Sequence, residues 1–416
     1  MAYAIQADTG APAALSALAK LSLAIAVFLS AFVLYEPAPY EVYIAVLMTV
    51  WFLFGLRLSR TSGMLLAILM IFNIGGLLAL TVMEQIRPNL VLYVAVSFFL
   101  ALSAVFFSAV IEADHRRLKI IFAAYVLGAL VTALAGIIGY FNLFPGSEMF
   151  TRYGRAKGVF QDPNVFGPYL VLPACYLLHR TLTGGFLSSL PRIVMLLVFT
   201  LAIFLAFSRA AWGLYALSIL LLVFFLLLKE RSTVIRLRIF VAGIVGVSLL
   251  TVSLLVVLQF DQVSELFSQR ARLLQEYDAA QFGRFDRYGL GFILSMDHPL
   301  GIGPLAFGRL FGEDTHNIWL KALLDYGWIG FVAFVILVVS TVAMGFKCLL
   351  RDRPWQPYFL CAYIVFVGHV LIATFIDIDH WRHFFILLGI IWGCIGLEAS
   401  TMRNRRAPHA RIVKPA

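Results

Sequence analysis

The chain has 416 residues, of which 62% are hydrophobic and only 13% are charged, and its formal net charge is +10 at pH 7. A soluble globular domain has about 45–50% apolar and about 25% charged residues, so this composition excludes a soluble enzyme or binding module. The positive charge does not indicate a nucleic-acid-binding protein either, because the Lys and Arg residues form short clusters between apolar runs and no basic stripe with interleaved aromatic residues.

Apolar runs long enough to cross the hydrocarbon core of a bilayer recur along nearly the whole chain. The first run is not followed by a small-residue cleavage site, so we expect it to be a retained span. Together the runs predict an all-α, polytopic transmembrane helical bundle of about 12 spans. The spans are expected near residues 13–34, 39–56, 62–82, 89–111, 119–141, 164–179, 191–208, 211–228, 238–259, 326–347, 358–376 and 383–399.

Basic residues are concentrated in every second connection between these spans and in the C-terminal tail. An even number of spans places both termini on one side, and the positive-inside rule then assigns the termini and the basic connections to the cytoplasm. The basic residues of this set are Lys20, Arg57, Arg60, Arg116, Arg117, Lys119, Arg180, Arg192, Lys229, Arg231, Arg236, Arg238, Lys347, Arg351, Arg353, Arg403, Arg405, Arg406, Arg411 and Lys414.

The connections on the opposite side should be poor in cations, yet four of them are not. Long loops are translocated largely regardless of charge, but the short turn at Ser208 and Arg209 is not a long loop. Arg209 therefore indicates an anionic ligand, with an arginine that snorkels to lipid headgroups as the alternative. The cations of these four connections are Arg152, Arg155, Lys157, Arg209, Arg270, Arg272, Arg284, Arg287, Arg309, Lys321 and Arg382, and a fifth connection on this side contains only Arg87.

One long segment, residues 260–325, lies outside the predicted spans, and a loop of this length is usually functional. Apolar residues at helical spacing among charges between Asp261 and Tyr277 predict an interfacial amphipathic helix within it. The chain accordingly divides into residues 1–259 with nine spans, the loop 260–325, residues 326–399 with three spans and the basic tail 400–416.

His316 is the strongest catalytic candidate, because it lies in a polar stretch where the long loop meets the next apolar segment. An imidazole titrates near neutral pH and can accept the proton of a hydroxyl nucleophile. The neighbouring Asn317 is a further substrate contact. The alternative is that Thr315 or Asn317 caps a helix while His316 only fills space beside it.

Arg209, Arg284 and Arg287 present guanidinium groups whose geometry suits phosphate oxygens. If they share a face with His316, they can hold a diphosphate leaving group. This combination is typical of a glycosyl-transfer site, which needs a base for the acceptor hydroxyl and cations for the charge that builds on the departing diphosphate. The alternative for the two loop arginines is a solvated charge.

Arg152, Arg155 and Lys157 form a second basic cluster, before Asp162 and Pro163. We expect Asp162 to cap a helix that begins at Pro163. The three cations are candidate substrate-binding residues, with a structured turn as the alternative.

Carboxylates and imidazoles gather between the last two predicted spans, from Asp377 to His383. They could in principle ligate a divalent metal. Ion pairing among Asp377, Asp379 and Arg382 explains the same residues, so no metal site is predicted and Asp379 and Arg382 are retained as substrate-binding candidates. We interpret His369, in the middle of a predicted span, as structural.

Five motifs occur in the order found in the O-antigen ligase and polymerase superfamily of bacteria, which the chain resembles over about residues 150–345. The resemblance implies a GT-C-like glycosyltransferase of the bacterial inner membrane that takes a glycan from an undecaprenyl-diphosphate carrier at the periplasmic face. The motifs span residues 155–164, 207–211, 283–287, 298–304 and 315–330.

The resemblance also implies roles for particular residues. Arg209 and Arg284 correspond to arginines that engage the diphosphate, and His316 to the histidine linked to acceptor activation. The implied reaction is an inverting displacement with no metal or other cofactor. Two departures leave questions open: Ala210 stands where glycine is common, and Arg287 competes with Arg284 for the loop role.

The acceptor is not determined by these motifs. A ligase hands the glycan to the lipid A core, and a polymerase adds it to another carrier-linked chain; the long loop before His316 favours the ligase. A lipid-linked glycan transporter is the non-enzymatic alternative, but transporters place polar groups near the midplane in repeated halves. Bilayer lipids, the donor and acceptor, and polysaccharide assembly proteins are the expected partners, with no nucleic acid.

Overall fold

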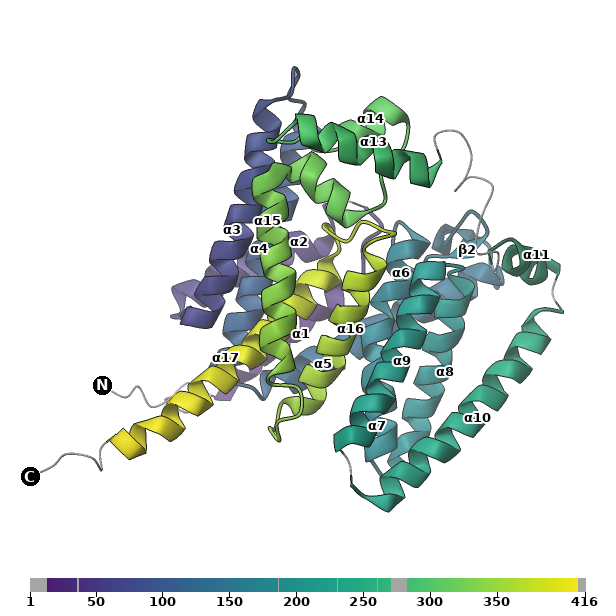
Figure 1. Cartoon of the computed structure of the whole chain (residues 1–416). Helices are drawn as coiled ribbons and strands as arrows, with labels where there is room; N and C mark the ends of the chain where they lie inside the picture. The colour runs from purple at the N-terminus through teal and green to yellow at the C-terminus, as the bar shows by residue number, and fades with distance from the viewer. Residues whose placement is uncertain are drawn as a thin grey trace, which may run out of the picture.

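The computed structural model describes residues 13–35, 37–185, 187–229, 231–259, 261–270 and 283–410. Within these ranges the chain is almost entirely helical, as predicted, and the two strands β1 (Thr151–Arg152) and β2 (Arg155–Ala156) form a short antiparallel pair. The helices (Figure 1) are α1 (Ala13–Leu29), α2 (Pro39–Leu53), α3 (Arg60–Thr81), α4 (Pro88–Ala113), α5 (Arg117–Tyr140), α6 (Pro163–Tyr169), α7 (Val171–Thr183), α8 (Leu190–Leu205), α9 (Arg209–Lys229), α10 (Thr233–Val257), α11 (Asp261–Arg270), α13 (Arg284–Asp297), α14 (Ala306–Phe311), α15 (Ile318–Phe346), α16 (Gln356–Ile372) and α17 (Arg382–Ala410), with short 3₁₀ helices at Ser147–Phe150 and Leu187–Ser189.

Each predicted span falls on a helix, except that residues 164–179 are divided between α6 and α7. Pro168 lies at this division, where its missing N–H removes a hydrogen bond from the helical ladder. Among the described residues, six helices are long and apolar enough to cross a membrane, and α1, α2, α8 and α16 are shorter apolar helices. The chain is therefore a polytopic membrane protein, while the number of twelve crossings stays a prediction.

The described part of the long loop contains the short helices α11, α13 and α14. The amphipathic helix appears as α11 up to Arg270, and residues 271–277 of that prediction lie outside the described residues. Helix α15 begins at Ile318, before the predicted start of span ten at residue 326. The helix changes direction at Gly327, whose φ of 65° is readily adopted by glycine, and the predicted span corresponds to the part after this kink.

Helices α3 and α15 pack closely through small residues. A Cβ on Gly75 of α3 would lie 2.8 Å from the backbone nitrogen of Gly330, and Phe72 stacks on Tyr326 with ring centroids 4.0 Å apart. Small residues allow such close approach in membranes, where dispersion contacts between helices replace the hydrophobic effect.

We expect Gly75→Ala to destabilise this crossing by about 1–3 kcal/mol, since the added methyl group meets backbone atoms that cannot move independently. The measurement is the apparent melting temperature of the purified protein in detergent. Gly63→Ala on the same helix is the matched control, because no atom lies within 4 Å of its added Cβ. An equal melting temperature for both variants would contradict the close packing.

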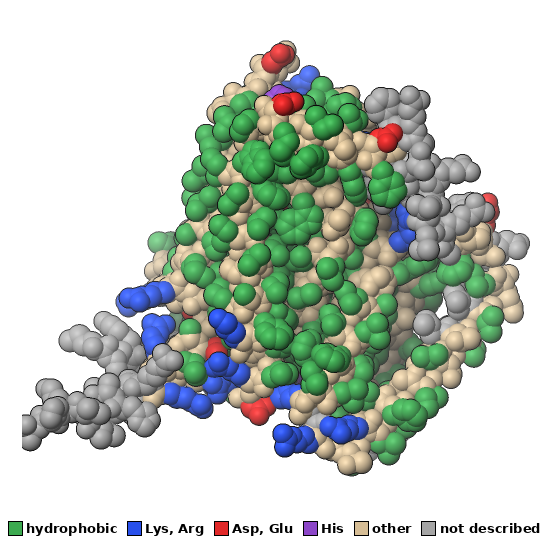
Figure 2. Space-filling view, viewed as in Figure 1, with side chains coloured by type: hydrophobic (Ala, Val, Ile, Leu, Met, Phe, Trp, Pro, Cys, Tyr) green, Lys and Arg blue, Asp and Glu red, His purple; other side chains and the backbone are tan. Residues whose placement is uncertain are grey.

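The two ends of the bundle differ in charge and in structure. Figure 2 shows most of the visible Lys and Arg side chains at the end where α9 and α15 finish. Helices α13 and α14 lie at the opposite end, with the connection from α16 to α17. The basic residues thus gather at one end of the bundle, and the assignment of that end to the cytoplasm stays a prediction.

Candidate active site

His316 lies directly before α15 in a constrained backbone conformation. The side chain of Asn317 caps the helix and accepts hydrogen bonds from the backbone N–H groups of Trp319 at 3.0 Å and Leu320 at 3.3 Å. Asn317 is thus the cap, one of the two residues, Thr315 and Asn317, that the alternative interpretation offered for this role. His316 itself has a φ of 49°, in the left-handed region that side chains other than glycine adopt at a cost. Such strain persists only where the surrounding structure enforces it, and it is concentrated at functional sites.

The imidazole of His316 lies between two carboxylates. Its Nε2 atom is 3.1 Å from Oε1 of Glu313, and its Nδ1 atom is 3.5 Å from Oδ2 of Asp377. The hydrogen bond with Asp377 is the main cause that raises the pKa of His316 above its usual value; Glu313 adds to the effect and burial opposes it. The side chain is 39% exposed, so the ring remains accessible from outside the bundle.

Glu313 also binds Arg287, which is buried on α13. The Arg287 Nη1 atom donates to Oε2 of Glu313 and, at 3.4 Å, to the carbonyl oxygen of Asp314. Arg287 therefore attaches α13 to the segment that carries His316. Arg284 is the first residue of α13, but its side chain lies outside the described residues.

We expect Glu313→Gln to lower the pKa of His316, because one of the two carboxylates that stabilise its imidazolium is removed. If catalysis requires the neutral imidazole, the rising limb of kcat/KM against pH should then move to lower pH. The measurement is this profile for the wild type and the variant. An unchanged or upward-shifted limb would contradict the role of Glu313.

Asp377 and Asp379 both lie in the connection between α16 and α17, but they contact different residues. Asp379 is buried and accepts hydrogen bonds from Tyr93 at 2.7 Å and Tyr326 at 3.3 Å, and His380 Nδ1 lies 2.9 Å away. Burial alone would raise the pKa of Asp379, but the charge of His380 and its hydrogen bond, with further help from Lys321, hold it well below its usual range.

The predicted ion pairing among Asp377, Asp379 and Arg382 is wrong. Asp377 faces His316, while Arg382 at the start of α17 forms a buried ion pair with Glu41 at the start of α2. Arg382 thus holds two helices together. The three side chains have different neighbours in the tertiary structure, and the sequence alone does not show which neighbours they have.

His369 is enclosed in the bundle, in agreement with its structural interpretation. Its Nδ1 atom lies 2.8 Å from the carbonyl oxygen of Val365, and its Nε2 atom lies 3.2 Å from Nε2 of His383. Both rings are almost fully buried.

Arg209 is the first residue of α9 and is positioned by the turn before it. Buried Arg155 donates from Nε to the carbonyl oxygen of Ala206 and from Nη2 to the side-chain oxygen of Asn164, each at 2.8 Å. Phe207 in the same turn has a φ of 44°. Arg155, a predicted substrate ligand, therefore holds the α8–α9 turn against α6.

The position of Arg209 along the bundle follows from the packing of α9 on α16. Gly368 of α16 packs on Leu214 of α9, and the two helices run in opposite directions (Figure 1). Arg209 precedes Leu214 by about 7.5 Å of helical rise, which brings it to the level of the last residues of α16.

His316 lies at this same level. The carbonyl oxygen of Ala373, directly after α16, accepts a hydrogen bond of 2.9 Å from the backbone nitrogen of Ile318. His316 and Arg209 are therefore both placed near the level of the C-terminal end of α16.

The basic loop before α6 has a clear local structure. Asp162 caps α6, as predicted, and accepts a hydrogen bond of 2.6 Å from the backbone nitrogen of Asn164. Arg152 is exposed and donates to the carbonyl oxygen of Gln161 at 3.1 Å. Burial, and then the charge of Arg152, lower the pKa of the half-buried Lys157.

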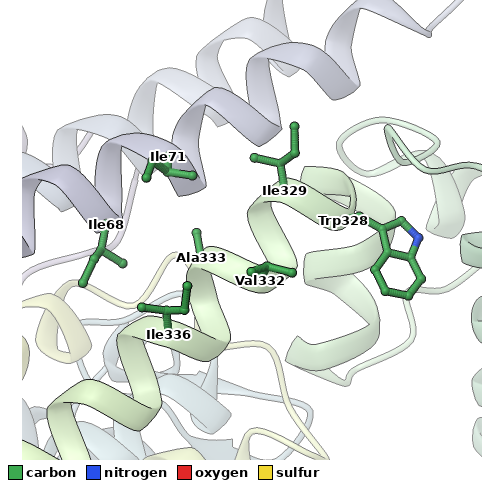
Figure 3. Close-up of a pocket in the computed structure, with 7 residues that line it drawn as sticks. All are labelled: Ile68, Ile71, Trp328, Ile329, Val332, Ala333 and Ile336. Atoms are coloured by element: carbon green, nitrogen blue, oxygen red, sulfur yellow. The ribbon is translucent and has the colours of Figure 1, made fainter.

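A groove of about 470 Å³ lies between α3 and α15 (Figure 3). It is lined by apolar side chains, with Ile68 and Ile71 on α3 and residues from Trp328 to Ile336 on α15. These residues lie inside candidate membrane spans, and none belongs to the His316 cluster. The groove therefore offers hydrocarbon contacts and no reacting groups.

The sequence interpretation missed the partners of the site residues. Glu313 and Asp377 were noted only as members of polar clusters, and Lys321 only as a misplaced cation. A local signal did exist for Lys321, since Asp325 follows at the i+4 spacing of helical ion pairs. No local signal connects Asp377 to His316.

Comparison with known proteins gives one family. Residues 193–335 match the family model described as O-antigen ligase, a region that contains Arg209, Arg284, Arg287 and His316. A search of curated proteins found no significant match.

Proposed function

We propose that this chain, a member of the O-antigen ligase superfamily, is a membrane glycosyltransferase that moves a glycan from undecaprenyl diphosphate to a hydroxyl acceptor at the periplasmic face of the bacterial inner membrane. The observation that carries the proposal is His316, which lies accessible between Glu313 and Asp377 at the end of the bundle that also presents Arg209. The matched family region contains both His316 and Arg209.

In the proposed reaction, the acceptor oxygen attacks the anomeric carbon and the bond from that carbon to the diphosphate oxygen breaks. The bonding electron pair leaves with the diphosphate, and the hydroxyl proton passes to His316, with inversion at the anomeric carbon. The acceptor hydroxyl replaces Glu313 at Nε2, while Asp377 stays at Nδ1 and orients the ring. Glu313 retains Arg287 as its partner during this exchange.

We assign the diphosphate to Arg209 and Arg284, because guanidinium groups stabilise the charge that develops on the leaving group. Arg287 is less suited, since it is buried and already paired with Glu313. Arg152 and Lys157 are proposed contacts for the outer part of the substrate. The remaining predicted substrate ligands, Arg155, Asn317, Asp379 and Arg382, are proposed to support the site, because their polar groups bind the protein itself.

We propose the lipid A core as acceptor, because a long loop precedes the histidine motif; polymerisation of carrier-linked repeat units is the alternative. The test offers the purified protein an undecaprenyl-diphosphate glycan with either acceptor and measures release of the carrier diphosphate. A ligase transfers only to lipid A core, and a polymerase only to a carrier-linked glycan. Absence of transfer to both acceptors, from protein shown to be folded, would overturn the proposed function.

The glycan profile of a deletion strain provides an independent measurement. Loss of a ligase leaves carrier-linked polymer and bare core, loss of a polymerase leaves core capped with single repeats, and loss of a transporter leaves the carrier-linked glycan on the cytoplasmic side.

A further inference from the structure

Lys321 lies behind His316, in the first turns of α15, and only 5% of it is exposed. Its Nζ atom is 3.3 Å from Oδ2 of Asp314 and 3.4 Å from Oδ2 of Asp325. It is also 4.0 Å from Oδ2 of Asp377. One ammonium group thus joins the segment before α15, α15 itself and the connection between α16 and α17.

Asp377 links this ammonium group to the imidazole. The same oxygen, Oδ2, faces both Nζ of Lys321 and Nδ1 of His316. The other oxygen, Oδ1, is buried and has no hydrogen-bond partner among the described residues. Lys321 therefore stabilises the negative charge of Asp377, and this charge acts directly on the imidazole of His316.

Among the described side chains, carboxyl groups outnumber the permanent cations around this cluster, and burial raises the pKa of one of them, Asp325, to about 7. His316 faces two carboxylates, one of which is bound to Arg287, and Lys321 faces two more. Asp379, which is paired with His380, also acts electrostatically on Lys321. The carboxylates are Glu313, Asp314, Asp325, Asp377 and Asp379, and the permanent cations are Arg287 and Lys321.

We infer that Lys321 is a positioning residue whose ammonium group is the fixed counter-ion of the carboxylates behind His316, and that through Asp377 it sets the proton affinity of the imidazole. A buried charge of this kind is stabilised only by paired charges, and the three carboxylates supply that pairing. Without the ammonium group, the carboxylates would draw a proton onto His316 at higher pH. The use of this imidazole as a base rests on the proposed function, but the effect on its proton affinity does not.

The test measures the protonation of His316 directly in the full-length protein. Diethyl pyrocarbonate modifies neutral imidazole, so the extent of modification at His316, followed by peptide mass spectrometry across pH, gives its midpoint. We expect Lys321→Met to raise this midpoint by about 1 pH unit. Lys321→Arg keeps the positive charge and should leave the midpoint near that of the wild type.

Lys321→Met leaves three carboxylates without their cation, so a second comparison keeps the test valid if this variant does not fold. Asp325→Asn and the double variant Lys321→Met/Asp325→Asn differ only at Lys321. The double variant also buries one carboxyl group fewer than Lys321→Met alone. The midpoint should be higher in the double variant than in Asp325→Asn. Equal midpoints in this pair, or in folded Lys321→Met and the wild type, would overturn the inference.

The pH profile of transfer separates this inference from the proposed function. The rising limb of kcat/KM should move upward in Lys321→Met together with the modification midpoint, and Lys321→Arg should restore it. If the wild type transfers no glycan, the proposed function fails while the modification experiment still tests Lys321. If the wild type is active and the midpoint does not move, only the role of Lys321 is wrong.

Discussion

Replacement of His316 by alanine is expected to lower kcat for glycan transfer by about 10²–10⁴-fold, the range that a positioned general base contributes. The imidazole is accessible at the end of the bundle to which we assign the acceptor hydroxyl, and Asp377 orients it from behind. The measurement is release of carrier diphosphate by purified protein at saturating donor and acceptor.

His115→Ala is the matched control, because this histidine lies at the other end of the bundle, where its ring is 5.7 Å from that of Trp355. It should retain wild-type activity. If His316→Ala is as active as His115→Ala, the imidazole is not the base, and the interpretation of His316 as a residue that fills space beside the helix cap is correct.

Replacement of Arg209 by alanine is expected to reduce transfer by about 10²–10³-fold, since a cation that stabilises a leaving group contributes most in the transition state. The residue begins α9 at the level of His316, and Arg155 fixes the turn before it. Arg209→Lys should recover only part of the activity, because lysine keeps the charge but loses the two-pronged geometry that suits a diphosphate. The measurement is kcat and KM for the lipid-linked donor.

Arg57→Ala is the control for this prediction, since Arg57 is an exposed arginine in a connection assigned to the cytoplasmic end. An arginine that only snorkels to lipid headgroups would behave like Arg57. Full activity of both alanine variants would therefore contradict the proposed diphosphate contact at Arg209.

These two predictions depend on parts of the molecule that are held in place in different ways. His316 is fixed by a strained backbone, a helix cap and two carboxylates from separate segments. Arg209 is fixed by a turn that Arg155 fastens to α6. Loss of activity on replacement of Arg155 should therefore be accompanied by a lower melting temperature, whereas the loss expected for Arg209→Ala should not.

The sequence by itself determined the helical class, the positions of the apolar helices and the local caps. A segment that lies in hydrocarbon has to satisfy its own backbone hydrogen bonds, so long apolar runs become helices whatever their neighbours are. The caps at Asp162 and Asn317 depend only on side chains within three residues of the backbone groups that they bind. The motifs around Arg209 and His316 were likewise local, and they lie in the region, residues 193–335, that matches the O-antigen ligase family model.

Only the tertiary structure decided which charges meet. Arg382 pairs with Glu41 from the opposite end of the chain, Asp377 faces His316, and the carboxylates around Lys321 come from three segments. An ion pair depends on the distance between two groups in space, and one linear sequence contains no signal for distances between remote segments. The turns of α15 before the Gly327 kink are mostly apolar, and their buried Lys321 is paired with carboxylates from other segments.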